Sequence, residues 1–424
     1  MTRRPLFAGA AAFVLLLSAD LSPPLSAQGH HQDYDDVDPW AGFEPREPGP
    51  DSSAVAAFIT ALRSSSAAVC DLAVNSIGNN WDGRGRHHRV GMLTAETGQP
   101  AAGELFQRPV TDGRALAYLA DVLGDSHPCV RRAAARILGQ SGEPEAVRLL
   151  RDALKNSDTR VREAAALGLA SAQDPASFRD LSRALEDKDP SVTRMAAYAL
   201  GDLEDARAVK PLGALLEARD AGTRAAAAWA LGEIEDIRAV DRLSSAAQDR
   251  DFEVRIAAVE ALGEIEDKRS TGTLTKALKD KEVELRRAAA EALGNVEDNK
   301  AAGALAQAID DPDPVVRRLA AQALGELDEL HRAPIRLTAA LSDRDPELRI
   351  IAAKALGEIG DTTSVPALSA AYRSDDPRLR YAVVHALGEM DDHRSDELLS
   401  VAREDRDGIV RHAASEAFKD RHDD

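Results

Sequence analysis

Two amphipathic patterns alternate along most of the chain. In one segment Val240, Leu243 and Ala247 recur at the spacing of a helix face. A few residues later Val254 and Leu262 belong to a second run with the same period, filled in by alanines. No stretch of this region alternates apolar and polar residues as a strand would. The pattern therefore predicts pairs of helices and no sheet.

An acidic residue precedes both predicted helices of this unit. Asp236 stands before the first helix of this pair, and Asp251 stands three residues before Val254 at the start of the second. Aspartate is a favoured N-cap because its side chain accepts a hydrogen bond from a free backbone N–H of the first turn. Each unit is thus predicted to be a helix–turn–helix.

The helix pair is repeated at a fixed period. Counted from the glycine of "ALG", each step is 31 residues, apart from one of 32 between Gly325 and Gly357. The ten equivalent residues are Gly139, Ala170, Gly201, Gly232, Gly263, Gly294, Gly325, Gly357, Gly388 and Lys419. A period in this range indicates a solenoid, in which each hairpin buries its apolar side on the next. We predict an all-α, right-handed α-solenoid of ten to eleven repeats, with the regular array spanning 113–424.

The repeated segments carry a family resemblance. "DFEVRIAAVEALGEIED" and "DPRLRYAVVHALGEMDD" resemble HEAT repeats of the short bacterial kind known as PBS-lyase HEAT-like repeats. The resemblance implies an armadillo-like helical array. Relatives of this kind include phycobilin lyase subunits, deoxyhypusine hydroxylases and plain binding scaffolds. An enzyme or enzyme subunit and a structural spacer therefore stay open as alternatives to a binding scaffold.

The chemistry of the side chains argues against the enzymatic alternatives. The hydroxylases resemble this chain in fold but hold di-iron with paired His-Glu dipeptides, and none of the ten histidines here precedes a glutamate. No motif of bilin attachment, phosphate loop or zinc spacing is present. We therefore expect a non-enzymatic protein with no catalytic residue, no metal and no cofactor.

The N-terminus has the features of an export signal. Residues 1–27 contain two arginines, an apolar stretch of about 14 residues and a Pro-rich break before Ala27. The apolar stretch is too short to span a bilayer comfortably. We expect a signal peptide over 1–27 and a periplasmic or extracellular mature chain. Residues 28–50 are acidic and Pro-rich, and we expect a disordered tail there.

The overall charge limits the partners. Acidic residues outnumber basic ones 72 to 53, for a net charge of −19, and loss of 1–27 would bring it to −20. Nucleic-acid binding needs a positively charged surface, so we expect no nucleic-acid partner. No other segment is apolar enough to cross a membrane. We expect a monomer that binds a protein or peptide.

The segment before the regular array departs from the period. Residues 51–112 begin with two helical patterns that resemble a degenerate repeat, in which Val69 precedes Gly78 by nine residues. An irregular, Gly-rich insertion follows over 79–112. Such insertions on a rigid array often carry binding and are also often simply tolerated.

The chain has two cysteines, Cys70 and Cys129, each at the start of a predicted second helix. Packed helices lie about 8–10 Å apart, whereas a disulfide needs Cα atoms within about 7 Å. Export would supply an oxidising compartment. A disulfide and two independent buried thiols are both compatible with the sequence.

The row of second helices should form the concave wall, and one stripe on it varies from repeat to repeat. Near the N-terminal end the stripe carries Arg132, Arg136 and Arg194, and then Tyr198 and Trp229 in adjacent repeats. Aromatic residues and arginine dominate binding hot spots. These five residues are the predicted partner-binding site, for a partner with an apolar anchor and some acidic residues. The alternative is that Trp229 fills a local packing gap.

A second repeated feature, which we call the arginine ladder, lies beside the stripe on the same predicted helices. An arginine stands eight residues before the glycine slot in nearly every repeat, with an acidic residue four positions earlier, as in Asp158 and Arg162. Such a pair shares one helix face. The even recurrence predicts a structural line of alternating charge in place of an ion or phosphate track.

Overall fold

The computed structural model describes residues 49–77 and 108–420. The chain divides into two units, 1–47 and 48–424, and all described residues lie in the second. The predicted signal peptide, the acidic tail and most of the 79–112 insertion lie outside the described residues.

The described residues form α-helices joined by short turns, without a strand, as the sequence predicts. The first helices of the ten regular pairs are α4 (Gly113–Asp121), α6 (Pro144–Ala153), α8 (Phe178–Ala184), α10 (Val209–Leu215), α12 (Val240–Ala246), α14 (Thr271–Ala277), α16 (Ala302–Ala308), α18 (Ile335–Ala340), α20 (Val365–Ala371) and α22 (His393–Ala402). The second helices are α5 (Pro128–Gln140), α7 (Thr159–Ala172), α9 (Pro190–Asp202), α11 (Ala221–Glu233), α13 (Phe252–Glu264), α15 (Val283–Val296), α17 (Pro314–Glu326), α19 (Pro346–Ile359), α21 (Pro377–Glu389) and α23 (Gly408–Asp420). A further pair, α1 (Ser52–Arg63) and α2 (Ala67–Ser76), precedes them.

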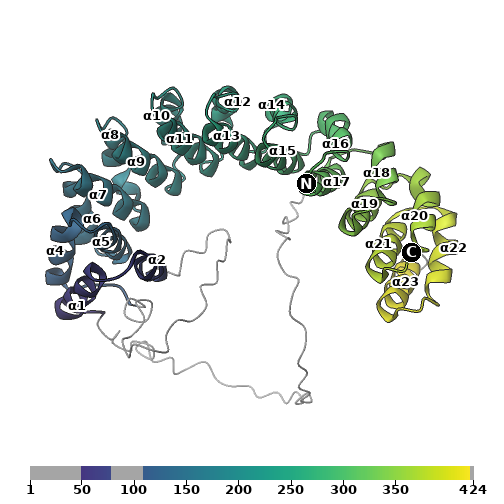
Figure 1. Cartoon of the computed structure of the whole chain (residues 1–424), viewed down its shortest axis with the longest axis horizontal. Coiled ribbons are helices and arrows are strands. Elements are labelled where there is room, and N and C mark those ends of the chain that lie inside the picture. The colour runs from purple at the N-terminus through teal and green to yellow at the C-terminus, as the bar shows by residue number, and fades with distance from the viewer. Residues whose placement is uncertain (1–48, 78–107, 421–424) are drawn as a thin grey trace, which may run out of the picture. The chain divides into compact units, whose positions relative to one another are not determined.

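Each second helix packs against the second helices of the neighbouring repeats, so that these helices form one continuous row (Figure 1). The first helices form a parallel row, and each also packs on the second helix of its own pair. The apolar faces meet between the rows, where Leu243, Val254 and Leu262 are fully buried. The all-α solenoid expected from the period is therefore confirmed.

The helix starts follow the aspartates. Asp251 caps α13 by accepting a hydrogen bond from the backbone N–H of Glu253. Asp236 accepts from the N–H of Arg238, but here it caps a 3-10 turn, Ile237–Ala239, that leads into α12. The first helices are consequently shorter than the second, and it is the second helices that carry the longer surface.

Glycine lets the second helices approach closely. A methyl group on Gly232 would lie 2.9 Å from the Cα of Ala261 in the next repeat, closer than such atoms come in proteins. Gly263 stands in the same relation to Ala292. The recurring Ala-Leu-Gly therefore brings neighbouring backbones together, and side chains at equivalent positions of adjacent repeats come within reach of each other.

Candidate functional site

The second-helix row, meaning the face formed by α2, α5 and the odd-numbered helices after them, carries an aromatic pair between α9 and α11. The ring centroids of Tyr198 and Trp229 are 5.1 Å apart, and the ring planes meet at 63° in an edge-to-face arrangement. Tyr198 is 37% exposed and Trp229 is half-buried. Two aromatic faces are thus presented side by side on the surface of the row.

The repeat itself creates this pair. Tyr198 and Trp229 each stand three residues before the glycine slot of their repeat, and α9 packs along α11. A methyl group on Gly201 would be 2.9 Å from ring carbon Cζ3 of Trp229. Because a glycine occupies that position, the Trp229 ring lies against the backbone of α9 and reaches Tyr198. Trp229 therefore does pack against the neighbouring repeat, yet part of it stays accessible.

A carboxyl group with an unusual pKa adjoins the pair. Asp202 follows Gly201 at the end of α9, and burial raises its pKa to about 7, with the charges of Glu233 and Glu204 adding to the effect. Since desolvation and neighbouring negative charge both disfavour ionisation, the Asp202 carboxyl group stays protonated up to a higher pH than an ordinary aspartate does. Asp202, Glu204 and Glu233 thus form a group of carboxyl groups at the C-terminal ends of α9 and α11.

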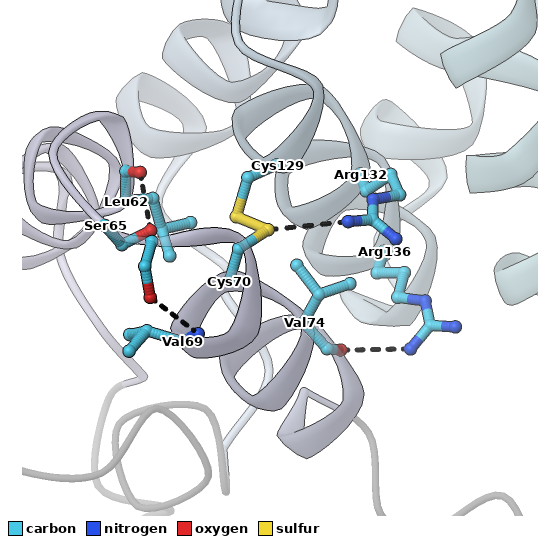
Figure 2. The surroundings of a disulfide bond; sticks show 9 residues. Leu62, Ser65, Val69, Cys70, Val74, Cys129, Arg132 and Arg136 are labelled. Atoms are coloured by element: carbon cyan, nitrogen blue, oxygen red, sulfur yellow. Dashed lines mark hydrogen bonds between the residues drawn. A yellow bond between two sulfur atoms is a disulfide. The ribbon is translucent and has the colours of Figure 1, made fainter.

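The two arginines of α5 are bound to the preceding helix. Nη1 of Arg136 donates to the carbonyl oxygen of Val74 at 3.0 Å, and Nη2 of Arg132 lies 3.5 Å from the Sγ of Cys70 (Figure 2). Burial, and then the charge of Arg132, lowers the pKa of Arg136. Arg132 is exposed and Arg136 is half-buried. Both side chains help to hold α2 against α5.

Arg194 belongs to an arrangement that recurs along the row. Its Nη1 donates to Oδ2 of Asp220 at 2.9 Å. The same carboxylate caps α11 through the N–H and hydroxyl of Thr223. The equivalent arginines Arg287 and Arg318 bind the cap aspartates of their own next repeats in the same way.

The five residues of the predicted binding site therefore do not form one cluster. Tyr198 and Trp229 lie together, and Arg132 and Arg136 lie together on α5, which α7 separates from α9 in the row. The three arginines all have partners within the chain. The stripe gave no sign of this engagement, because the acceptors lie in other helices.

Cys70 and Cys129 form a disulfide. Their Cα atoms are 5.8 Å apart, within the range that a disulfide requires (Figure 2). Because Cα atoms lie about 2.3 Å from a helix axis, two that face each other can come this close at the usual spacing of packed helices. Both cysteines are buried. The bond joins the irregular pair to the first regular repeat.

Four arginines of the ladder, including Arg162, form ion pairs with aspartates of the next repeat. The prediction that each pairs with the acidic residue four positions before it is wrong for them. Nε and Nη2 of Arg162 bind the carboxylate of Asp187 at 2.7 and 3.0 Å, 25 residues further along. Asp158, four residues before Arg162, instead caps α7 by accepting from the N–H of Arg160. A helix N-terminus gains from a carboxylate acceptor, and this leaves the guanidinium free to reach the next repeat.

In residues 49–77 and 108–420, no three His, Cys, Asp or Glu side chains are grouped so that they could hold a metal ion. Across the same ranges, no helix combines the length and the apolar character needed to span a membrane.

The chain belongs to the family of HEAT-repeat proteins. The family's sequence pattern matches in overlapping windows that run from 116–201 to 333–419. No curated protein matches the chain in sequence.

Three solved structures are similar to parts of the chain. An engineered protein is 21% identical, with 72% of this chain and 98% of that one covered and a TM-score of 0.47. The CpcE–CpcF complex of phycocyanin lyase from Nostoc sp. PCC7120 is 24% identical, covering 57% and 94%, with a TM-score of 0.34. Human deoxyhypusine hydroxylase is 25% identical, covering 58% and 96%, with a TM-score of 0.28.

Proposed function

We propose that this HEAT-repeat protein is an exported, non-enzymatic scaffold that captures an extended protein or peptide partner along the second-helix row. The observation that carries the proposal is the edge-to-face pair of Tyr198, which is exposed, and Trp229, which is half-buried. Large aromatic side chains that stay partly accessible on a rigid element are typical anchors of protein interfaces.

The charges near the pair favour a partner that differs from the sequence expectation. Arg132, Arg136 and Arg194 are engaged within the chain, so they are poorly placed to attract acidic residues. Asp202 and Glu233 stand four residues after Tyr198 and Trp229, one turn further along the same helices, and the charge of Glu233 acts on Asp202. We therefore propose an apolar anchor flanked by a basic residue, which would pair with Asp202 and favour its ionised form.

The proposed anchor can be tested by comparing aromatic residues at two places on the row. The mature chain, immobilised, is used to capture partners from the periplasm of the source cells. Trp229→Ala and Tyr198→Ala should each reduce capture by at least about tenfold, since loss of a central anchor commonly costs 2 kcal/mol or more. Helical content by circular dichroism should not change.

Two controls lie far along the same row. Tyr381 in α21 is 39% exposed, close to the exposure of Tyr198, and Glu358 lies in α19. Tyr381→Ala and Glu358→Ala should capture the partner as the parent chain does. Equal capture by all four variants would exclude the aromatic pair as the anchor and favour a spacer role or a site elsewhere.

Export is proposed from the sequence of 1–27 and has its own test. The full-length gene is expressed in the source cells, which are then fractionated. The expected result is a periplasmic or secreted chain whose first residue by N-terminal sequencing is Gln28. An uncleaved chain in the cytosol would exclude export without bearing on the binding surface.

A further inference from the structure

One position of the repeat changes its chemistry in a regular order along the second-helix row. It lies three residues before the glycine slot, and the helices that carry it pack side by side. From α5 to α13 it is occupied by Arg136, Leu167, Tyr198, Trp229 and Glu260. Tyr198 and Glu260 are exposed, and the other three are half-buried. The row thus presents an arginine, three large apolar side chains and a carboxylate, one from each repeat.

The spacing of these side chains selects the conformation of a peptide that contacts all of them. Packed helices lie about 8–10 Å apart. A polyproline II helix has three residues per turn, so side chains on one of its faces follow each other at about 9.3 Å. On one face of a β-strand the interval is about 6.6 Å, and the turn of an α-helix is about 5.4 Å. Of these three conformations, polyproline II matches the row, with one residue in three facing each repeat.

The chain itself contains a segment with this period. In the Pro-rich tail, residues 28–50, every third position from 34 to 46 holds a large apolar or a basic residue: Tyr34, Val37, Trp40, Phe43 and Arg46. The residues between them are aspartate, glutamate, proline, alanine and glycine. Pro39 and Pro45 favour the polyproline II backbone. Three apolar residues followed by a basic one are the complement of three apolar residues followed by a carboxylate.

Charge decides the direction of the tail on the row. When Val37 faces Leu167, the two aromatic residues that follow it face the aromatic pair, and Arg46 faces Glu260. The three aspartates between positions 34 and 46 then lie near α5 and α7, away from the glutamates of α13 and α15. The reverse direction would bring Arg46 onto Arg136. Opposite charges across a contact fix its register, and like charges oppose it.

The length of the tail decides which copy supplies it. Three residues lead from Arg46 to Gly49, the first described residue, and they span about 10 Å when extended. The N–H of Ser52 donates to Asp112, which caps α4, so the tail joins the array at its first repeats. Helix α13 lies four helices beyond α5 in the row, roughly 30 Å or more away (Figure 1). A chain therefore cannot place its own Arg46 on its own Glu260.

We propose that the second-helix row binds the tail of a second copy of this chain, with residues 34–46 lying across α5 to α13 in the polyproline II conformation. The proposal rests on the proposed function of the row as a surface for an extended peptide, and it names one occupant. Surfaces lined by aromatic residues commonly bind such segments. The tail covers Tyr198 and Trp229, so self-association and capture of another protein exclude each other. This differs from the monomer expected from the sequence.

Sedimentation velocity of the mature chain tests the self-association. The sedimentation coefficient of the parent should rise as its concentration is raised to about 200 µM, a range that detects weak binding. Trp40→Ser in the tail and Trp229→Ala on the row should each weaken the association at least about tenfold, as loss of a central anchor does. Ala41→Ser, between two facing positions, and Tyr381→Ala, in α21, are the controls and should associate as the parent does.

A mixture of the two weakened variants identifies the contact. Trp40→Ser keeps an intact row and Trp229→Ala keeps an intact tail, so the mixture should form one-to-one pairs although neither variant associates alone. A mixture that does not associate would overturn the proposal, as would a parent chain that stays monomeric over the whole range. Since Trp40 lies outside the array of helices, its replacement tests the contact even where Trp229→Ala weakens the fold.

A synthetic peptide of residues 32–48 tests the register. It should dissociate the parent complex. A peptide of the same composition, in which Val37 and Phe43 each exchange places with the residue after them, should not. Equal competition by both peptides would overturn the three-residue match and, with it, the proposal.

Capture from the periplasm separates this proposal from the proposed function. If the parent chain stays monomeric while Trp229→Ala still loses capture, the tail is wrong as the occupant and the binding surface stands. If the mixture associates while Trp229→Ala captures as the parent does, the tail is the occupant and the capture of another protein at the aromatic pair is wrong.

Discussion

The ring of Trp229 lies against Gly201 of the preceding second helix, so closely that a methyl group on Gly201 would come within 2.9 Å of ring carbon Cζ3. The same methyl group would be 2.9 Å from the Cα of Ala230. A ring can rotate away, whereas the backbone of α11 cannot move without shifting the repeat. The contact between Tyr198 and Trp229 therefore depends on a residue that carries no side chain.

Gly201→Ala should consequently loosen the packing of α9 on α11. We expect a loss of about 1–3 kcal/mol in the free energy of unfolding, the usual cost of overpacking. Denaturant titration followed by circular dichroism measures it. Gly303→Ala in α16 is the control, because a methyl group there meets nothing within 4 Å. That change should stabilise by up to about 1 kcal/mol, as alanine favours helix. Equal effects of the two changes would contradict the close approach.

The inter-repeat ion pairs should be costly to break from one side. Arg224 and Asp249 expose only 6% and 16% of their side chains. Arg224→Met leaves the Asp249 carboxylate without its counter-charge, and we expect a loss of about 3 kcal/mol in the free energy of unfolding. The double variant Arg224→Met/Asp249→Leu should be less destabilised than the single one.

Arg238→Met is the matched control for that change. Arg238 is 62% exposed and pairs with Asp236 within its own turn. Thermal unfolding of this variant should differ little from that of the parent chain. A loss as large as that of Arg224→Met would show that burial does not set the cost.

The disulfide should stabilise the N-terminal end of the array selectively. Cys70 and Cys129 are 59 residues apart, and a bond that closes such a loop typically contributes about 2–4 kcal/mol. Cys129→Ser should make α1 and α2 more susceptible to limited proteolysis while α11 to α15 stay protected. Mass spectrometry of the parent chain, purified without reducing agent, should find neither thiol free. Two free thiols, or cleavage spread evenly over the array, would contradict this role.

Asp202 should make the stability near the aromatic pair depend on pH. Its pKa is about 7 in the folded chain and 3.8 for an ordinary aspartate. Between these values the folded state holds more protons than the unfolded state, so stability falls as pH rises from about 4 to 7. Asp202→Asn removes this penalty. We expect it to stabilise the chain at pH 8 by on the order of 1–2 kcal/mol, with solvent screening allowed for, and to have little effect at pH 4.

The measurement is the free energy of unfolding of parent and variant at the two pH values. Asp241→Asn is the control, because the Asp241 side chain is 86% exposed. The fluorescence of Trp229 adds a local probe, read in a chain in which Trp40 and Trp81 are replaced by phenylalanine. Its titration midpoint should lie near pH 7 and disappear in Asp202→Asn. A midpoint near pH 4 would contradict the raised pKa.

Much of the fold could be predicted because the same pattern of apolar and capping residues recurs in every repeat. The position of Val254 or Leu262 in the core follows from a period that ten units share, and the caps at Asp251 and its equivalents follow from local chemistry. The contact between Tyr198 and Trp229 is of the same kind, since equal positions in neighbouring repeats must meet.

The ion-pair and hydrogen-bond partners of the arginines could not be predicted from the sequence, for a physical reason. Arg162 has an acidic residue four positions before it and another 25 positions after it, and only the stacking of repeats decides between them. The partner of Arg136 is a backbone carbonyl of α2, which carries no signal in the sequence.

The disulfide between α2 and α5 should make the two ends of the array unequal in stability. In a stack where each repeat contacts only its neighbours, the terminal repeats lack one neighbour and fray first. Among the described helices, the N-terminal end of the array is fastened by a covalent bond, while α23 at the C-terminal end packs on α21 and α22 without such a bond. Loss of structure should therefore start at the C-terminus and advance repeat by repeat toward α5, so that the segment with the aromatic pair outlasts the half of the chain beyond it.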